Sequence, residues 1–237
     1  MKKIFLKVLV AMLSVFLLAG CGNTGETTLT GSENGNENTQ SAENTQTAGE
    51  AVAGTEENQT NNEQTELLSG KHIAKIQVKD MGTITVELDA DTAPITVTNF
   101  VNLAESGFYD GITFHRIIKD FMMQGGDPLG NGTGGSEQTI TGEFASNGVE
   151  NPLSHTRGAI SMARNNFDMN SASSQFFIVH QDSLFLDGEY ATFGYVTEGM
   201  DIVDAICEQT TGQDVNGVVP MENRPVIETI EIVKEAE

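Results

Sequence analysis

The chain has 237 residues, of which 34 are acidic and 12 are lysine or arginine, and its formal net charge is −22 at pH 7. Affinity for nucleic acids comes largely from neutralising phosphates, so this charge argues against a nucleic-acid partner. It also opposes binding to an anionic bilayer by charge alone. Solubility is a sufficient explanation of the acidity, and we infer no partner from it.

The first 20 residues have the pattern of a secretory signal. Three lysines within the first seven positions precede an apolar run at residues 8–19, which is the order of a basic n-region and a short h-region. The sequence Leu-Ala-Gly-Cys at residues 18–21 resembles the lipobox of bacterial lipoproteins. We therefore expect residues 1–20 to be a signal peptide, Cys21 to be lipidated, and the protein to be extracytoplasmic and anchored to the cell membrane. A transmembrane anchor is the alternative, but a span needs about 20 apolar residues and this run is shorter.

Residues 21–69 read as a lipidated cysteine followed by a disordered tether. Residues 22–69 contain nine glutamates but no lysine, arginine or aromatic residue, and such a stretch cannot bury enough apolar surface to offset its ordering entropy. A flexible coil of this length has an end-to-end distance of about 40 Å, which would hold a domain clear of the lipid headgroups. The remaining residues, 70–237, have the size of one domain, and we expect a monomer.

The domain begins with β-type sequence and then turns helical. Residues 72–90 contain two strand-like runs, and we expect a hairpin. Residues 91–109 predict a helix, with Asp91 or Thr92 as the N-cap and Pro94 in the first turn.

Short strands dominate the rest of the domain. Loops rich in Gly, Asn, Asp and Ser separate five strand-like runs, at residues 112–118, 121–126, 159–164, 174–180 and 191–196. Residues 199–209 predict a second helix, and residues 225–235 alternate as a final strand. Many short strands with only two helices predict a mainly β fold, a closed or nearly closed β-barrel with helices at its ends.

The patterns typical of metal, phosphate and covalent chemistry are missing. The glycine-rich stretch 125–135 lacks the lysine of a phosphate loop and the carboxylate spacing of a calcium loop, so we interpret it as turn geometry. No histidine lies in an HxH or HExxH pair, and Ser161 and Ser174 lie in no GxSxG elbow. We expect no metal and no cofactor. With Cys21 acylated, Cys207 has no disulfide partner and is expected to be a buried, inert thiol.

One arginine stands out instead. On a strand through residues 112–118, the period of two would place four side chains on one face, those of Ile112, Phe114, Arg116 and Ile118. From this pattern alone, Arg116 is either a structural ion-pair residue or a functional one.

Three segments resemble the signature blocks of the cyclophilin family of peptidyl-prolyl cis–trans isomerases. They are FHRIIKDFMMQGGDPLGNGTGG at residues 114–135, GAISMAR with NSASSQFFIVH within residues 158–180, and LFLDGEYATFGYVTEGMDIVDAI at residues 184–206. Together with the first hairpin and helix, the resemblance covers essentially all of residues 71–237. It implies an eight-stranded antiparallel barrel capped by two helices, which agrees with the pattern of strands described above.

The resemblance also implies a site. Arg116 matches the catalytic arginine, and Phe121 and Gln124 match residues beside it that we count as catalytic. The residues expected to bind substrate are Met122, Ala163, Arg164, Phe177, Phe185, Leu186 and Tyr190. Phe177 matches the floor of the proline pocket, while Ala163 and the backbone of Arg164 match the segment that receives the peptide main chain. For Met122, Phe177 and Leu186 taken singly, plain core packing is the alternative.

Three positions depart from the family pattern. Phe185 stands where the family has Trp, which removes an indole N–H donor and bears on cyclosporin binding. Arg164 stands in place of Asn, which bears on substrate preference. Tyr190 stands where many members have His, and it keeps a ring with a polar tip that can still close the pocket.

The expected activity is rotation about X–Pro bonds in exported proteins, with proline-containing chains as the partners. Arg116 would donate a hydrogen bond to the proline nitrogen as that nitrogen loses conjugation. One alternative is a binding module that holds proline-containing segments without turnover. Another is a solute-receptor lipoprotein of a transporter, which would show alternating strands and helices around a two-lobed cleft.

Overall fold

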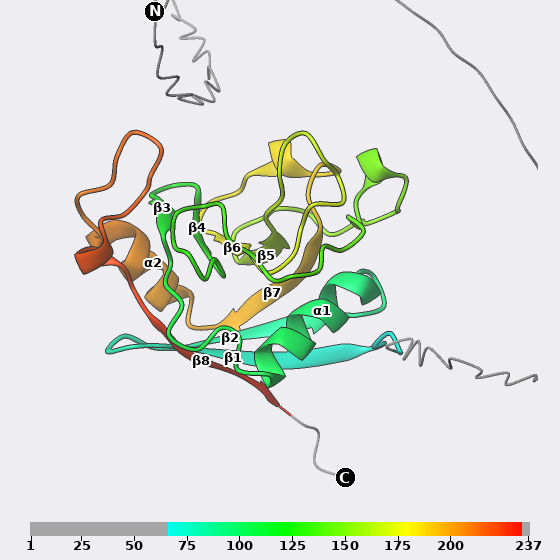
Figure 1. Ribbon diagram of the computed structural model, residues 1–237, viewed down its shortest axis with the longest axis horizontal. Helices are drawn as coiled ribbons and strands as arrows, with labels where there is room; N and C mark the ends of the chain where they lie inside the picture. Colours follow the sequence, from blue (N-terminus) through cyan, green and yellow to red (C-terminus); the bar gives the residue numbers. More distant parts are fainter. Residues whose placement is uncertain (1–65, 234–237) are drawn as a thin grey trace, which may run out of the picture. The chain divides into compact units, whose positions relative to one another are not determined.

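Eight strands and two α-helices make up most of the regular structure of residues 66–233, the part of the chain that the computed structural model describes (Figure 1). The strands are β1 (Lys71–Val78), β2 (Gly82–Asp89), β3 (Arg116–Ile118), β4 (Met122–Gly125), β5 (Ala159–Met162), β6 (Phe176–Val179), β7 (Thr192–Glu198) and β8 (Ile227–Val233). The helices are α1 (Pro94–Glu105) and α2 (Met200–Gln209), with three short 3₁₀-helices η1 (Ala145–Asn147), η2 (Leu184–Leu186) and η3 (Met221–Asn223). The expected signal peptide, the lipidated Cys21 and most of the expected tether lie outside the described residues.

All eight strands belong to one antiparallel sheet in the order β3-β4-β6-β5-β7-β2-β1-β8. The two ends of the sheet meet without a full ladder. An isolated bridge joins Thr113 to Val226, and the Phe114 N–H donates to the Pro225 carbonyl across 2.9 Å. The predicted eight-stranded antiparallel fold with two helices is therefore confirmed, with the sheet curled so that a few backbone hydrogen bonds, rather than a full ladder, link its edges.

The predicted strand at residues 112–118 is shorter and less regular than expected. Ile112 and Phe114 belong to the main core, whereas Ile118 packs against a second apolar cluster. The period breaks at His115, whose N–H bonds to the Gln124 carbonyl although Arg116 is the register partner of Gln124. His115 and Arg116 thus both lie opposite Gln124, as in a β-bulge, where two residues of one strand face one residue of its partner. The prediction that these side chains share one face is wrong for this reason.

Helix α1 begins at Pro94, which lies in the first turn as predicted, but its cap comes from far along the chain. The N-cap residue is Ala93, and no side chain of that residue caps the helix. The buried carboxylate of Glu143 instead accepts hydrogen bonds from the Ile95 and Thr96 N–H groups, at 3.0 and 2.8 Å. An anion at a helix N-terminus satisfies free N–H donors and interacts favourably with the helix dipole. The predicted caps Asp91 and Thr92 are therefore wrong.

The sheet has apolar side chains on two faces. The main core packs inner strand residues against both helices, around an aromatic group formed by Phe100, Tyr109, Phe114, Phe176 and Phe193. On β4, β5 and β6 other side chains point into the second apolar cluster. Burial on both faces explains why residues 176–179 read as a continuous apolar run.

This architecture differs from that of a two-lobed solute receptor. The described residues form one sheet with two α-helices, not strands and helices that alternate around two lobes, so the solute-receptor alternative is wrong for the described residues. No helix within residues 66–233 has both the length and the apolar character needed to cross a membrane.

Candidate active site

Most of the predicted site residues gather on the outer apolar face of β4, β5 and β6. We call this group the second cluster. Its buried members are Met122, Ala159, Phe177, Val179 and Leu186, and its partly buried members are Ile118, Phe121, Ala163, Tyr190 and Tyr195. Six of the ten predicted catalytic and substrate-binding residues thus belong to one cluster, although they come from separate segments of the chain.

Arg116 begins β3 at the border of this cluster. Its Nε donates to the Asn216 carbonyl across 2.8 Å, and its Nη1 donates to Oε1 of Gln124 across 3.3 Å. Among the described residues no carboxylate forms an ion pair with it. The structural ion-pair interpretation of Arg116 is therefore wrong.

The charge of Arg116 is partly withdrawn from water. Burial lowers the pKa of its guanidinium, and the nearby Tyr190 and Asp214 oppose that shift. An arginine stays protonated under ordinary conditions even so. The site thus combines a permanent cation with an apolar surface.

Gln124 links Arg116 to a chain of amides. Its Nε2 donates to Oε1 of Gln175 across 2.8 Å, and Nε2 of Gln175 donates to the Gly134 carbonyl across 2.7 Å. These contacts fix the orientation of the Gln124 amide, so that its oxygen faces Arg116.

The glycine-rich loop that supplies Gly134 has the predicted turn geometry. The buried carboxylate of Asp127 accepts hydrogen bonds from the N–H groups of Leu129, Asn131 and Gly132, at 2.8, 2.9 and 2.6 Å. Gly134 lies so close to this carboxylate that a Cβ there would come within 2.0 Å of the Asp127 Oδ1 atom.

Phe121 and Phe185 form an aromatic pair beside the second cluster. Their ring centroids lie 5.6 Å apart with an interplanar angle of 31°. Phe185 is 67% exposed, whereas the neighbouring Leu186 is only 7% exposed. Phe185 therefore presents an apolar surface to solvent, while Leu186 contributes to the cluster itself.

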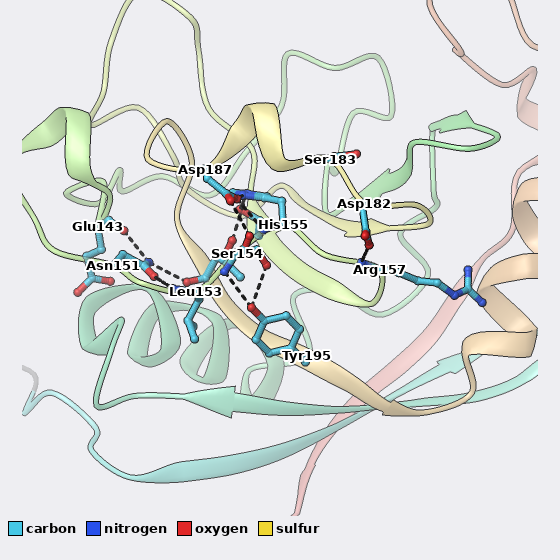
Figure 2. A network of polar contacts seen from close by, with 12 residues as sticks. Glu143, Asn151, Leu153, Ser154, His155, Arg157, Asp182, Ser183, Asp187 and Tyr195 are labelled. Atoms are coloured by element: carbon cyan, nitrogen blue, oxygen red, sulfur yellow. Dashed lines mark hydrogen bonds and ion pairs between the residues drawn. The ribbon is translucent and has the colours of Figure 1, made fainter.

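Phe177 lies on a buried histidine that sequence patterns did not identify. The rings of Phe177 and His155 are stacked with centroids 5.9 Å apart and an interplanar angle of 14°. The carboxylate of Asp187 accepts hydrogen bonds from the His155 backbone N–H at 2.7 Å and from Nδ1 at 2.8 Å (Figure 2). His155 and Asp187 are separated by 32 residues in no known motif, so only the fold brings them together.

The hydrogen bonds of His155 define its tautomer. With Nδ1–H donating to Asp187, Nε2 is the acceptor nitrogen, and it lies 3.0 Å from the Ser161 hydroxyl and 3.1 Å from the Thr192 hydroxyl. Burial lowers the pKa of His155, and the bonds to Asp187 only partly oppose this shift. We conclude that the imidazole is neutral at pH 7.

Ser161, His155 and Asp187 have the order of an acyl-transfer triad, but they do not form a reactive one. Ser161 and His155 are both 0% exposed, so the hydroxyl cannot reach a substrate. The contacts instead fix the ring beneath Phe177.

Ala163 and Arg164 follow β5, next to Tyr190. The Ala163 N–H donates to the Gln175 carbonyl across 2.9 Å. The Arg164 side chain is 7% exposed and packs over the rings of Phe144 and Tyr190. Its guanidinium therefore lies behind the wall that Tyr190 forms, and only its backbone remains a candidate for direct contact with a peptide.

Other parts of the described chain contribute little chemistry. No group of three or more His, Cys, Asp or Glu residues within residues 66–233 could bind a metal ion. Cys207 is buried, and burial raises its pKa to about 12, so the prediction of a buried, unreactive thiol is confirmed. A polar hollow of about 290 Å³ lies beside Asn99, Leu103 and Gln138, and none of the predicted site residues lines it.

Comparisons with known proteins identify the family to which the chain belongs. The family model described as cyclophilin type peptidyl-prolyl cis-trans isomerase/CLD matches residues 73–234. The peptidyl-prolyl cis-trans isomerase-like 1 of Neurospora crassa is 45% identical over 65% of this chain and 87% of its own length. The peptidyl-prolyl cis-trans isomerase B of Bacillus subtilis is 47% identical over 52% of this chain and 82% of its own length.

A solved structure has the same fold. The cyclophilin type peptidyl-prolyl cis-trans isomerase of Cryptosporidium parvum, crystallised in the presence of the dipeptide Ala-Pro, is 29% identical and superposes with a TM-score of 0.61. The alignment covers 69% of this chain and 99% of that one. This chain belongs to the family of cyclophilin-type peptidyl-prolyl cis–trans isomerases.

Proposed function

We propose that this isomerase binds proline-containing segments of exported proteins on the second cluster and accelerates rotation about their X–Pro bonds. The observation that carries the proposal is the position of Arg116. Its guanidinium has no carboxylate partner among the described residues, is oriented by Asn216 and Gln124, and lies at the border of the apolar second cluster.

Rotation about an X–Pro bond is slow because resonance makes the amide planar. The barrier of about 18–20 kcal/mol corresponds to tens to hundreds of seconds without a catalyst. In the twisted transition state the proline nitrogen regains a lone pair. A hydrogen bond from Arg116 to that lone pair is much weaker in the planar ground state, so it lowers the barrier rather than only tightening binding. Each gain of about 1.4 kcal/mol raises the rate about tenfold.

The remaining residues have complementary roles in this proposal. Met122, Phe177 and Leu186 bind the proline ring, because they present apolar surface within one cluster. Gln124 orients Arg116 and binds the peptide with the backbone after Ala163. The Ala-Pro dipeptide present in the Cryptosporidium parvum crystal supports a substrate of this class. No step in this scheme requires a cofactor.

We further propose that the enzyme acts outside the cytoplasm as a lipid-anchored monomer. The support is the sequence pattern alone: a basic and apolar N-terminus, the lipobox-like residues 18–21, and the polar composition of residues 22–69. Two or more acyl chains on Cys21 would give stable anchoring, which one chain would not. Clients would then be secreted chains that are still folding.

Two experiments test these proposals separately. The purified protein should accelerate the cis-to-trans conversion of an Ala-Pro test peptide, followed by NMR exchange spectroscopy; a rate equal to background would contradict the enzymatic proposal. Cells given an alkyne-tagged fatty acid should label the wild-type chain and not Cys21→Ala, and the variant should leave the membrane fraction. Equal labelling and fractionation of both chains would contradict lipid anchoring through Cys21, but would leave the proposal of isomerase activity unaffected.

A further inference from the structure

Arg164 is a charged residue with almost no contact with water. Its side chain is 7% exposed, which is rare for an arginine without several polar partners. Nε donates to the Glu189 carbonyl at 2.9 Å, Nη1 donates to the Asn165 carbonyl at 2.9 Å, and Nη2 lies 3.4 Å from the Glu189 carboxylate. One guanidinium thus ties the segment after β5 to the turn after η2.

Two aromatic rings enclose the same guanidinium. Its Cζ lies 5.1 Å from the centroid of Phe144 and 4.8 Å from the centroid of Tyr190. Both distances are within the range of cation–π attraction, which strengthens when the cation is withdrawn from water. Arginine is suited to this position because its planar group can stack on rings and donate in its own plane at once.

Tyr190 is also restrained on its other sides. Its ring meets the Phe177 ring edge-on, with centroids 6.0 Å apart and an interplanar angle of 84°. Its hydroxyl donates to Oδ1 of Asn166 at 3.3 Å. Arg164 therefore contacts an aromatic wall of the second cluster that lies in a loop, outside any strand or helix.

We propose that the side chain of Arg164 is a positioning group that fixes Tyr190 as a wall of the proline site and does not itself contact substrate. The inference rests on the proposed function of the second cluster. It gives the departure from Asn at this position a physical purpose: the arginine supports the tyrosine that stands where many family members have histidine. The Arg164 side chain then affects substrates only through Tyr190.

This indirect action makes a specific kinetic prediction. Arg164→Ala should lower kcat/KM for the Ala-Pro test peptide about tenfold, since displacement of a positioning group by about 1 Å can cost up to a hundredfold. Tyr190→Ala should lower it by a similar factor. The double variant should be no slower than Tyr190→Ala, because there is no ring left to position. Arg164→Lys should recover part of the loss, since it keeps the cation near both rings but not the planar set of donors.

A spectroscopic measurement tests the same contact without any turnover. The chain has three tyrosines and no tryptophan, so labelling with 3-fluorotyrosine gives three ¹⁹F signals, and Tyr190→Phe assigns one of them. Arg164→Ala should shift and broaden the Tyr190 signal while those of Tyr109 and Tyr195 stay in place. This readout separates the inference from the proposed function, because it does not depend on isomerase activity.

Arg157→Ala is the matched control. Arg157 also pairs with a carboxylate, that of Asp204 at 2.8 Å, but its side chain extends away from His155 (Figure 2). Arg157→Ala should leave kcat/KM and the Tyr190 signal unchanged.

Two results would overturn the inference. One is a double variant whose loss in kcat/KM equals the product of the losses in Arg164→Ala and Tyr190→Ala. The other is an Arg164→Ala protein in which the Tyr190 signal does not move. If Arg164→Ala does not fold, Arg164→Lys replaces it in the comparison of single and double variants with Tyr190→Ala, and the same criterion applies to its loss in kcat/KM.

Discussion

Arg116 and Gln124 lie opposite each other on β3 and β4, and Nη1 of Arg116 donates to Oε1 of Gln124 across 3.3 Å. The amide of Gln124 is itself oriented by Gln175. A flexible cation is thereby given a defined direction by neutral partners, which leave its charge uncompensated. This is the arrangement that a site needs if the cation is to act on a group that becomes an acceptor only in the transition state.

Removing the amide should disorder the arginine. We expect Gln124→Ala to lower kcat/KM for an Ala-Pro peptide about tenfold, because the Arg116 side chain would lose one of its two hydrogen bonds to oxygen acceptors and, with it, its direction. The change is measured by NMR exchange spectroscopy at several peptide concentrations. Gln138→Ala, which removes an exposed amide outside the cluster, is the control. An unchanged rate in Gln124→Ala would show that Arg116 is oriented without this contact.

Phe177 should matter for both stability and binding. Phe177→Ala is expected to lower the free energy of unfolding by about 3 kcal/mol, as other large-to-small changes of buried aromatic residues do. It should also weaken binding of the Ala-Pro peptide, because the ring covers His155 on one side and faces the second cluster. Urea unfolding and an NMR titration measure the two effects.

Phe167→Ala provides the comparison for that prediction. Phe167 is 86% exposed, so its removal should change the free energy of unfolding by less than about 0.5 kcal/mol. If Phe177→Ala lost stability but bound the peptide as wild type does, Phe177 would be a core residue and not part of the binding surface.

Glu143 should stabilise α1 from a distance. Glu143→Gln removes the negative charge that accepts the Ile95 and Thr96 N–H groups, and we expect it to lower the free energy of unfolding by about 1–2 kcal/mol. Glu150→Gln, which changes an exposed carboxylate, should change it little. Equal urea midpoints for both variants would rule out a role in capping.

The sequence patterns predicted the parts of this fold that depend on local signals. Alternation and turn residues indicated the hairpin and the number of strands, and Pro94 indicated the first turn of α1. The cap of α1 was not predictable, because Glu143 lies 47 positions after Thr96. The bulge at His115 was not predictable either, because it follows from pairing with β4 rather than from the residues of β3.

The same distinction applies to the site. Arg116, Gln124 and Phe177 could be chosen because they lie within recognisable segments. His155 and Asp187 were missed, because a histidine and an aspartate 32 residues apart carry no signal until the fold stacks one beneath Phe177. The direction of the Arg164 side chain depends on Phe144, which lies in a different loop.

Acid should destabilise the folded protein through its buried histidines. Burial lowers the pKa of His155 and of His115 below 6.5. As pH falls through about 6.5, the unfolded chain therefore takes up protons that the folded protein does not, and stability is lost until the folded pKa is reached. Carboxylates with lowered pKa, such as Asp187, lose their contribution only below about 3.8.

Urea unfolding between pH 7.5 and pH 5 measures this effect. We expect the free energy of unfolding to fall across that range, and to fall less steeply in His155→Gln, which cannot take up the proton. A slope that is the same in His155→Gln and wild type would show that His155 does not contribute to the dependence.

The most direct test of the account is the rate of X–Pro isomerisation in an Arg116 series. Wild-type protein should accelerate cis-to-trans conversion of the Ala-Pro peptide well above background. Arg116→Ala should lose about a hundredfold or more in kcat/KM, as is typical when a donor to a transition state is removed, with circular dichroism and urea unfolding close to wild type. Arg116→Lys should recover only part of the rate. An Arg116→Ala protein that isomerises the peptide at the wild-type rate would contradict the account.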